Sequence, residues 1–85
     1  MSQLEKLKQR LKQYPKDFTY HELQTLMCGL GFVENNRGKT SGSRVCFYRQ
    51  TDAAVFSCHK PHPAHYVKAY TLKKIVTFLT EKGDI

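Results

Sequence analysis

The sequence lacks long apolar runs, and it has few cysteines. None of its apolar stretches approaches the ~20 residues that a membrane-spanning helix needs. Its first ten residues, MSQLEKLKQR, carry too much charge for the apolar segment of a signal peptide. The three cysteines, Cys28, Cys46 and Cys58, are an odd number without the spacing of a disulfide framework. We therefore expect a cytoplasmic protein with reduced thiols and no contact with a membrane.

Acidic residues are scarce in one part of the chain, and this asymmetry is informative. Between Arg37 and Lys74 there are eight basic residues and a single acid, Asp52, whereas the rest of the chain holds six residues of each sign. The whole net charge of +7 therefore lies in this window. Because each neutralised phosphate releases condensed counterions, such a concentration favours a nucleic-acid partner over a charge that serves solubility alone.

The length of 85 residues leaves room for one domain, and we expect residues 1–85 to form a single folded unit. Leucine spacing and capping signals predict three helices in it. The first spans residues 2–14 and is expected to pack on its own domain. The second begins after a capping-box pair, Thr19 and Glu22, and ends at Gly31. The third is expected to have Thr71 as its N-cap and to end at Gly83.

Segments rich in valine, phenylalanine and tyrosine predict three strands. A short strand begins at Phe32, and two longer ones, residues 44–50 and 54–59, are joined by a tight turn as an antiparallel hairpin. The resulting order is α-α-β-β-β-α. It indicates an α+β domain in which the helices pack on one face of a three-stranded antiparallel sheet.

Three of the four histidines lie in HKPHPAH, directly after the last predicted strand. Metal-independent RNA cleavage needs a base for the 2′-hydroxyl, an acid for the leaving 5′-oxygen and cations for the charged phosphorane. Histidine suits the proton steps because its charge changes near neutral pH, and arginine and lysine suit the third role. The candidates are His59 and His62, with Arg44 on the neighbouring strand. The residue types alone leave open a basic edge that binds RNA without cutting it.

The loop NNRGKTSGSR offers hydroxyls, charges and glycines that let a backbone approach a ligand closely. These groups suit phosphate oxygens and read no base by themselves, and a merely exposed loop is the alternative. Together with the basic residues outside it, the loop supplies the candidate RNA-binding residues, which are Arg37, Lys39, Ser41, Ser43, Arg49, Lys60, Lys68, Lys73 and Lys74.

The sequence does not favour a zinc site or a cysteine nucleophile. Cys58, His59, His62 and His65 are zinc-ligand types, but Cys58 and His59 are adjacent on a strand and their side chains diverge. We expect neither a metal nor a cofactor. The three cysteines are expected to be buried structural residues rather than nucleophiles.

Four motifs occur in an order similar to that of HicA-type toxins, which are small bacterial endoribonucleases of type II toxin–antitoxin systems. They are LGF at the end of the second helix, GKTSGSR before a strand, HKPHP and YTLKKIVTFL. The resemblance covers residues 17–82, which leaves residues 1–15 as a helical extension. It implies a fold like the double-stranded-RNA-binding domain, cleavage of messenger RNA, and neutralisation by a HicB-type antitoxin. Lys73 and Lys74 would then face phosphates.

The sequence departs from the family at one position. The family carries its catalytic histidine in a G-S-H motif, whereas here Gly42 and Ser43 precede Arg44. Arginine stays protonated near neutral pH, so it is a poor base but a good phosphate ligand. The resemblance then implies one of two outcomes. Either Arg44 clamps the scissile phosphate while His62, or else His59, moves the protons, or the chain binds RNA without cutting it.

Overall fold

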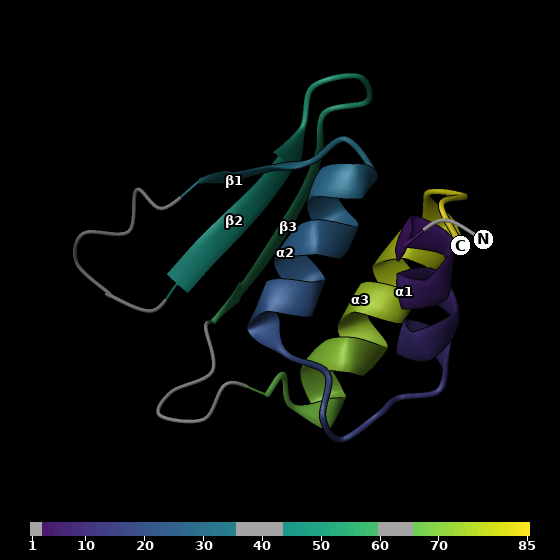
Figure 1. Ribbon diagram of the computed structural model, residues 1–85. Coiled ribbons are helices and arrows are strands. Elements are labelled where there is room, and N and C mark those ends of the chain that lie inside the picture. The colour runs from purple at the N-terminus through teal and green to yellow at the C-terminus, as the bar shows by residue number, and fades with distance from the viewer. Residues whose placement is uncertain (1–2, 36–43, 60–65) are drawn as a thin grey trace.

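Three helices and three strands follow one another in the predicted order α-α-β-β-β-α in the computed structural model, which describes residues 3–35, 44–59 and 66–85 (Figure 1). The elements are α1 (Gln3–Lys12), α2 (Tyr20–Gly29), β1 (Val33–Asn35), β2 (Arg44–Arg49), β3 (Ala54–His59) and α3 (Ala69–Glu81). The expected α+β class and element order are confirmed. Within these ranges, none of the helices is long and apolar enough to cross a membrane.

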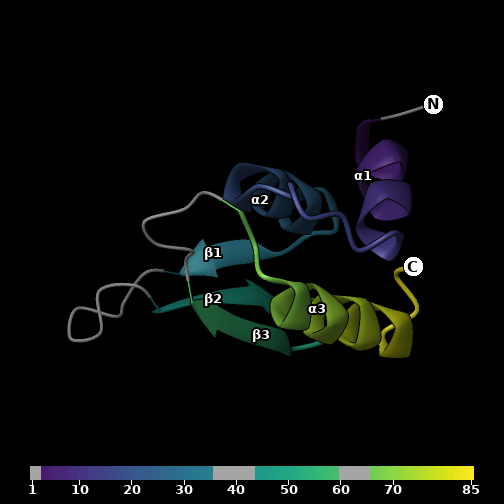
Figure 2. The same cartoon turned by 90° about the horizontal axis from the view of Figure 1, so that it is seen from below.

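The strands form one antiparallel sheet in the order β1-β2-β3, with the helices on one of its faces (Figure 1). Seen from below, α2 lies towards β1 and α3 towards β3 (Figure 2). Alternation along the strands separates two sets of side chains. Val45, Phe47 and Phe56 are buried under the helices, whereas Arg44, Ser57 and His59 are exposed. The second set lies on the open face of the sheet.

The helix α1 is part of the same hydrophobic core as α2, α3 and the sheet. Leu7 and Leu11 are buried in one cluster with Leu26, Phe47 and Ile75. This packing confirms the expectation that the first helix docks on its own domain.

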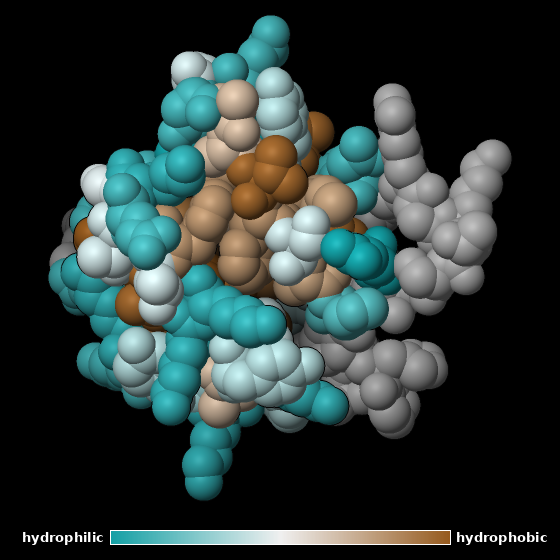
Figure 3. All heavy atoms as spheres, turned by 180° about the vertical axis from the view of Figure 1, so that it is seen from behind, coloured by the Kyte–Doolittle hydropathy of each residue, from teal (hydrophilic) through white to brown (hydrophobic). Residues whose placement is uncertain are grey.

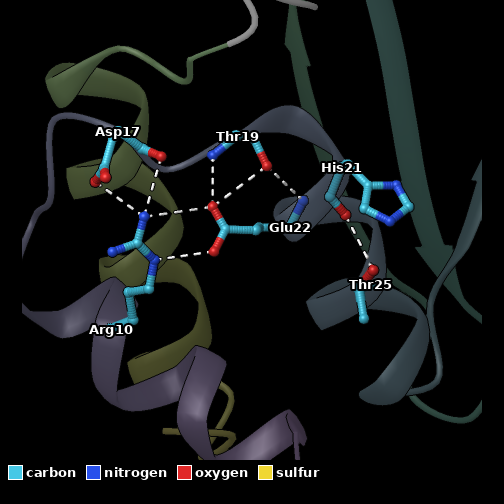
Figure 4. A network of polar contacts seen from close by, with 6 residues as sticks. All are labelled: Arg10, Asp17, Thr19, His21, Glu22 and Thr25. Carbon is cyan, nitrogen blue, oxygen red and sulfur yellow. Dashed lines mark hydrogen bonds and ion pairs between the residues drawn. The ribbon is translucent and has the colours of Figure 1, made fainter.

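The start of α2 is fixed by the predicted capping box and by an arginine from α1 (Figure 4). The backbone N–H of Glu22 donates to Thr19 Oγ1 over 3.1 Å, and the backbone N–H of Thr19 donates to Glu22 Oε1 over 2.8 Å. Arg10 donates from Nε to Glu22 Oε2 and from Nη2 to Asp17 Oδ1, both over 2.9 Å. Electrostatic and capping contacts thus join α1 to the first turn of α2.

We expect Thr19→Ala to lower the free energy of unfolding by about 1 kcal/mol, because it removes the side-chain acceptor for the Glu22 N–H. Thr25→Ala is the matched control on the same helix. Its hydroxyl only donates to the already bonded carbonyl of His21, so its loss is expected to change stability by less than about 0.5 kcal/mol. Urea unfolding of both variants measures the difference, and equal losses would contradict the capping role.

The helix α3 begins earlier than the sequence predicts. Its N-cap is Lys68, which has an extended backbone and makes no side-chain capping bond. Thr71 lies inside the helix and is buried, so the prediction of Thr71 as N-cap is wrong. At the other end, Gly83 has a φ of 81°, and the N–H of Asp84 donates to the Leu79 carbonyl over 2.8 Å. The predicted glycine-terminated end is therefore confirmed.

Candidate nucleic-acid interface

Arg44 and His59 are direct cross-strand partners at one end of the sheet. Arg44 begins β2, His59 ends β3, and both side chains are exposed on the open face. Directly opposed residues of an antiparallel pair have Cβ atoms about 5 Å apart. The fold therefore brings a permanent cation and an imidazole, 15 residues apart in sequence, within reach of one ligand group.

A cavity of about 210 Å³ lies between this end of the sheet and the start of α3. Arg44 and His59 contribute from the sheet, and Tyr70, Thr71 and Lys74 contribute from α3. The remaining lining residues are Phe56, Ser57 and Cys58. None of these lining residues is acidic, so the cavity combines two cations and an imidazole without a competing carboxylate in its wall.

The side chains of Tyr70 and Lys74, which both line this cavity, also contact each other. Lys74 Nζ lies 5.6 Å from the centre of the Tyr70 ring, and Tyr70 is 57% exposed. A cation over an aromatic face gains electrostatic attraction from the ring. The contact holds the Lys74 ammonium at the first turns of α3, on the side that faces the cavity.

A second hollow adjoins the cavity along α3. It is lined by Phe56, Lys73, Lys74, Thr77, Phe78 and Glu81. Figure 3, which views the molecule from behind, shows apolar residues gathered at the centre of this side and hydrophilic residues around them. Lys73 lines this second hollow but not the first cavity, so it lies beside the cavity rather than in its wall. Lys68 is exposed at the N-cap of α3.

Six of the predicted site residues lie outside the described residues. They are Arg37, Lys39, Ser41, Ser43, Lys60 and His62. The described candidates that meet at the cavity are Arg44, His59 and Lys74.

Arg49 does not belong to this surface, and its assignment as an RNA-binding residue is corrected. It points to the helix side of the sheet, where its side chain is 10% exposed. Its guanidinium bonds Asp52 Oδ2 over 2.7 Å, Asp84 Oδ1 over 2.9 Å and the Leu30 carbonyl over 3.1 Å. It also lies 4.5 Å from the centre of the Phe32 ring. Because its donors are engaged inside the fold, Arg49 is a structural residue.

The cysteines differ from one another in exposure. Cys58 lies on the helix face of β3, and burial raises the pKa of its thiol to about 11, which disfavours the nucleophilic thiolate. His59, the next residue, is on the opposite face, so the two side chains diverge as predicted. Cys28 is exposed because it lies away from the Leu23, Leu26 and Met27 stripe of α2, so the expectation of burial is wrong for it. Cys46 and Cys58 are only half-buried, so the expectation is met in part for these two. Among residues 3–35, 44–59 and 66–85, no group of three metal-ligating side chains comes together.

The carboxylate of Glu34, near the sheet, has hydrogen-bond partners within the fold. Glu34 of β1 accepts hydrogen bonds from the Tyr20 hydroxyl and, over 2.7 Å, from the Gln24 amide. Burial, reinforced by the bond to Glu34, raises the pKa of Tyr20 well above its ordinary range. These contacts keep the Glu34 charge on the helix side of the sheet, away from the open face.

Tyr70 and Thr71 line the cavity but are not among the site residues predicted from the sequence. Both lie in the motif YTLKK, and the expected N-cap at Thr71 left Tyr70 outside the helix. With α3 beginning at Ala69, Tyr70 and Lys74 are four residues apart and share one face of the helix. That spacing is the signal that would have placed them together.

Comparisons of the chain with protein-family models, with curated proteins and with solved structures found no match.

Proposed function

We propose that this protein is an RNA-binding endoribonuclease that uses Arg44 and Lys74 to hold the scissile phosphate and His59 to move a proton. The proposal rests chiefly on one observation, which is that these three residues line one cavity and that none of its described lining residues is acidic. Two cations suit a phosphate whose negative charge grows as it is attacked.

The proposed reaction is the transesterification of RNA by its own 2′-hydroxyl. His59 accepts the 2′-hydroxyl proton while the 2′-oxygen forms a bond to phosphorus. The bond from phosphorus to the 5′-oxygen breaks, and the 5′-oxygen takes a proton from a protonated side chain or water. The products are a 2′,3′-cyclic phosphate and a 5′-hydroxyl end. Arg44 and Lys74 neutralise the pentacovalent phosphorane between these steps.

The resemblance to HicA-type toxins supports the same class of activity and adds a biological setting. In that setting the substrate is cytoplasmic messenger RNA, and a HicB-type antitoxin neutralises the enzyme. The structure brings Arg44, which occupies the family's catalytic histidine position, opposite His59. In this proposal, two residues share the role that one catalytic histidine has in the family. Arg44 holds the phosphate, and His59 moves the proton.

A second candidate function is RNA binding without cleavage. The arginine at the position of the family's histidine favours it, because a guanidinium holds phosphate but accepts no proton near neutral pH. Both candidates require the same cationic site, and they differ in whether bound RNA is cut.

The test is incubation of the purified chain with an unstructured RNA in EDTA, followed by analysis of the product ends. We expect cleavage with 2′,3′-cyclic phosphate ends, and RNA binding that weakens as salt rises. Arg44→Gln and Lys74→Gln are each expected to weaken binding about tenfold and to lower the salt slope by about one. Lys12→Gln, an exposed lysine on α1, is the matched control and should bind normally. Salt-dependent binding without cleavage would support the second candidate, and the absence of both would refute the proposal.

A further inference from the structure

The open face of the sheet carries its side chains in three cross-strand rows that change in character along the strands. The register gives the rows Val33–Tyr48–Val55, Asn35–Cys46–Ser57 and Arg44–His59. The first row is apolar and aromatic, the second is polar and uncharged, and the third is basic. The catalytic candidates therefore stand at one end of a face whose other end is apolar.

The three residues of the apolar row are exposed to solvent although their side chains are hydrophobic. Val33 is 66% exposed, Tyr48 is 42% exposed and Val55 is 53% exposed. Tyr48 lies on the central strand, between the two valines. All three helices lie on the other side of the sheet, so nothing in the described part of the chain covers this row (Figure 1).

We propose that the open face binds single-stranded RNA, with one base stacked on the Tyr48 ring and the backbone leading from there to Arg44 and His59. This inference rests on the proposed function and specifies its substrate as unpaired RNA. Exposed aromatic side chains that stack unpaired bases, combined with cations that follow the backbone, are the usual means by which sheet surfaces hold single strands.

The combination of an exposed apolar row and a basic row on one face favours RNA as its occupant. The apolar row is continuous with the Arg44–His59 row on the same face, and none of the eight side chains in the three rows is acidic. A second copy of the chain would bring another Arg44–His59 row to the same face, and the two copies, each with a net charge of +7, would repel each other. A nucleic acid supplies both groups that the face needs, a flat apolar base and an anionic backbone.

The spacing fits an extended strand of RNA. Tyr48 and Arg44 are four residues apart on β2, which corresponds to roughly 13 Å along a strand. A few nucleotides cover that distance. A regular duplex keeps its bases stacked on one another and cannot offer one to the tyrosine. In addition, an unpaired nucleotide reaches the in-line geometry of the proposed attack more easily than a paired one.

The first test compares RNA affinities by fluorescence anisotropy, with an unstructured 12-nucleotide RNA and the same sequence as a duplex. We expect the single strand to bind more tightly, and Tyr48→Ala to weaken its binding at least about fivefold. Tyr48→Phe should retain binding because it keeps the ring. Tyr14→Ala is the matched control, since Tyr14 is 43% exposed but follows α1.

The second test reads stacking directly. The chain contains no tryptophan, so Tyr48→Trp introduces a single indole reporter on the open face. We expect the single-stranded RNA to quench its emission with the same dissociation constant that anisotropy gives. Thermal unfolding of each variant, followed by circular dichroism, checks that the fold is intact.

The outcomes separate this inference from the proposed function. If Tyr48→Ala leaves single-strand binding unchanged while Arg44→Gln weakens it, RNA binding stands and the stacking face is refuted. Preferential binding of the duplex refutes the inference in the same way. A wild-type dimer in sedimentation velocity that Tyr48→Ala dissociates would show that a second copy covers this face. Failure of the wild-type chain to bind any RNA would remove the proposed function and this inference together.

Discussion

The Arg49→Ala variant is expected to unfold with a free energy about 3 kcal/mol lower than that of the wild-type protein. In a domain of this size the change corresponds to a melting temperature about 15 °C lower. The Arg49 side chain connects the β2–β3 turn through Asp52, the end of α2 through the Leu30 carbonyl, and the segment after α3 through Asp84. Its removal leaves the Asp84 carboxylate, which is 18% exposed, without its cation. Thermal unfolding measures the change, and a loss below about 1 kcal/mol would contradict it.

The dependence of the free energy of unfolding on pH, at acid pH, provides a second measurement for the same residue. The hydrogen bonds from Arg49 lower the pKa of Asp52 from its ordinary 3.8 to about 2. A carboxyl whose pKa is lowered by folding stabilises the native state above its ordinary pKa, and this contribution is lost as the pH falls towards 2. We therefore expect wild-type stability to fall between about pH 4 and pH 2 and the variant to lose less over this interval. Arg49→Lys, which keeps the charge without the two-pronged geometry, should be intermediate.

The largest effect on activity is expected for His59→Ala, which should lower the rate of RNA cleavage at least about 100-fold, the size of effect typical of a lost general base. RNA binding should persist, because Arg44 and Lys74 remain. The fold should also persist, because the His59 side chain is exposed on the open face of the sheet. The measurement is single-turnover cleavage with protein in excess over RNA, so that binding does not limit the rate.

His21→Ala is the matched control for this experiment, since His21 is an exposed histidine on α2, on the other side of the sheet. Its cleavage rate should equal that of the wild type. If His59→Ala retains activity, His62→Ala identifies whether the other candidate moves the proton. Retained cleavage in both single variants and in the double variant would exclude both histidines from the reaction.

Much of the fold could be predicted because its signals are local. Thr19 and Glu22 mark the start of α2 through a capping box that needs no distant partner, and Gly83 has the positive φ that ends α3. The alternation of Val45 and Phe47 with Arg44 and Cys46 also gives the two faces of β2. The same alternation excludes Arg49 from the open face, because Arg49 lies five positions after Arg44 on the strand, and an odd offset places a side chain on the opposite face. A count of charges ignores this alternation and therefore includes Arg49 among the surface cations.

The composition of the cavity could not be predicted, because it depends on how α3 lies against the sheet. No sequence pattern specifies that Lys74 and Tyr70 line the same cavity as Arg44 and His59. The start of α3 differs from the predicted one for a related reason. Threonine is a common N-cap, but Thr71 is buried by tertiary packing that takes precedence over its local preference.

The position of β3 at the end of the sheet has a consequence for the behaviour of concentrated protein. Among the described residues, no strand pairs with the outer side of β3, and the backbone groups of such an edge invite pairing between molecules. Lys73 and Lys74 of α3 line the hollow beside β3 together with one acid, Glu81, and the excess of positive charge there repels a second molecule that approaches edge to edge. Salt or a bound polyanion screens this repulsion, so colloidal stability of the protein depends on ionic strength as well as on its fold.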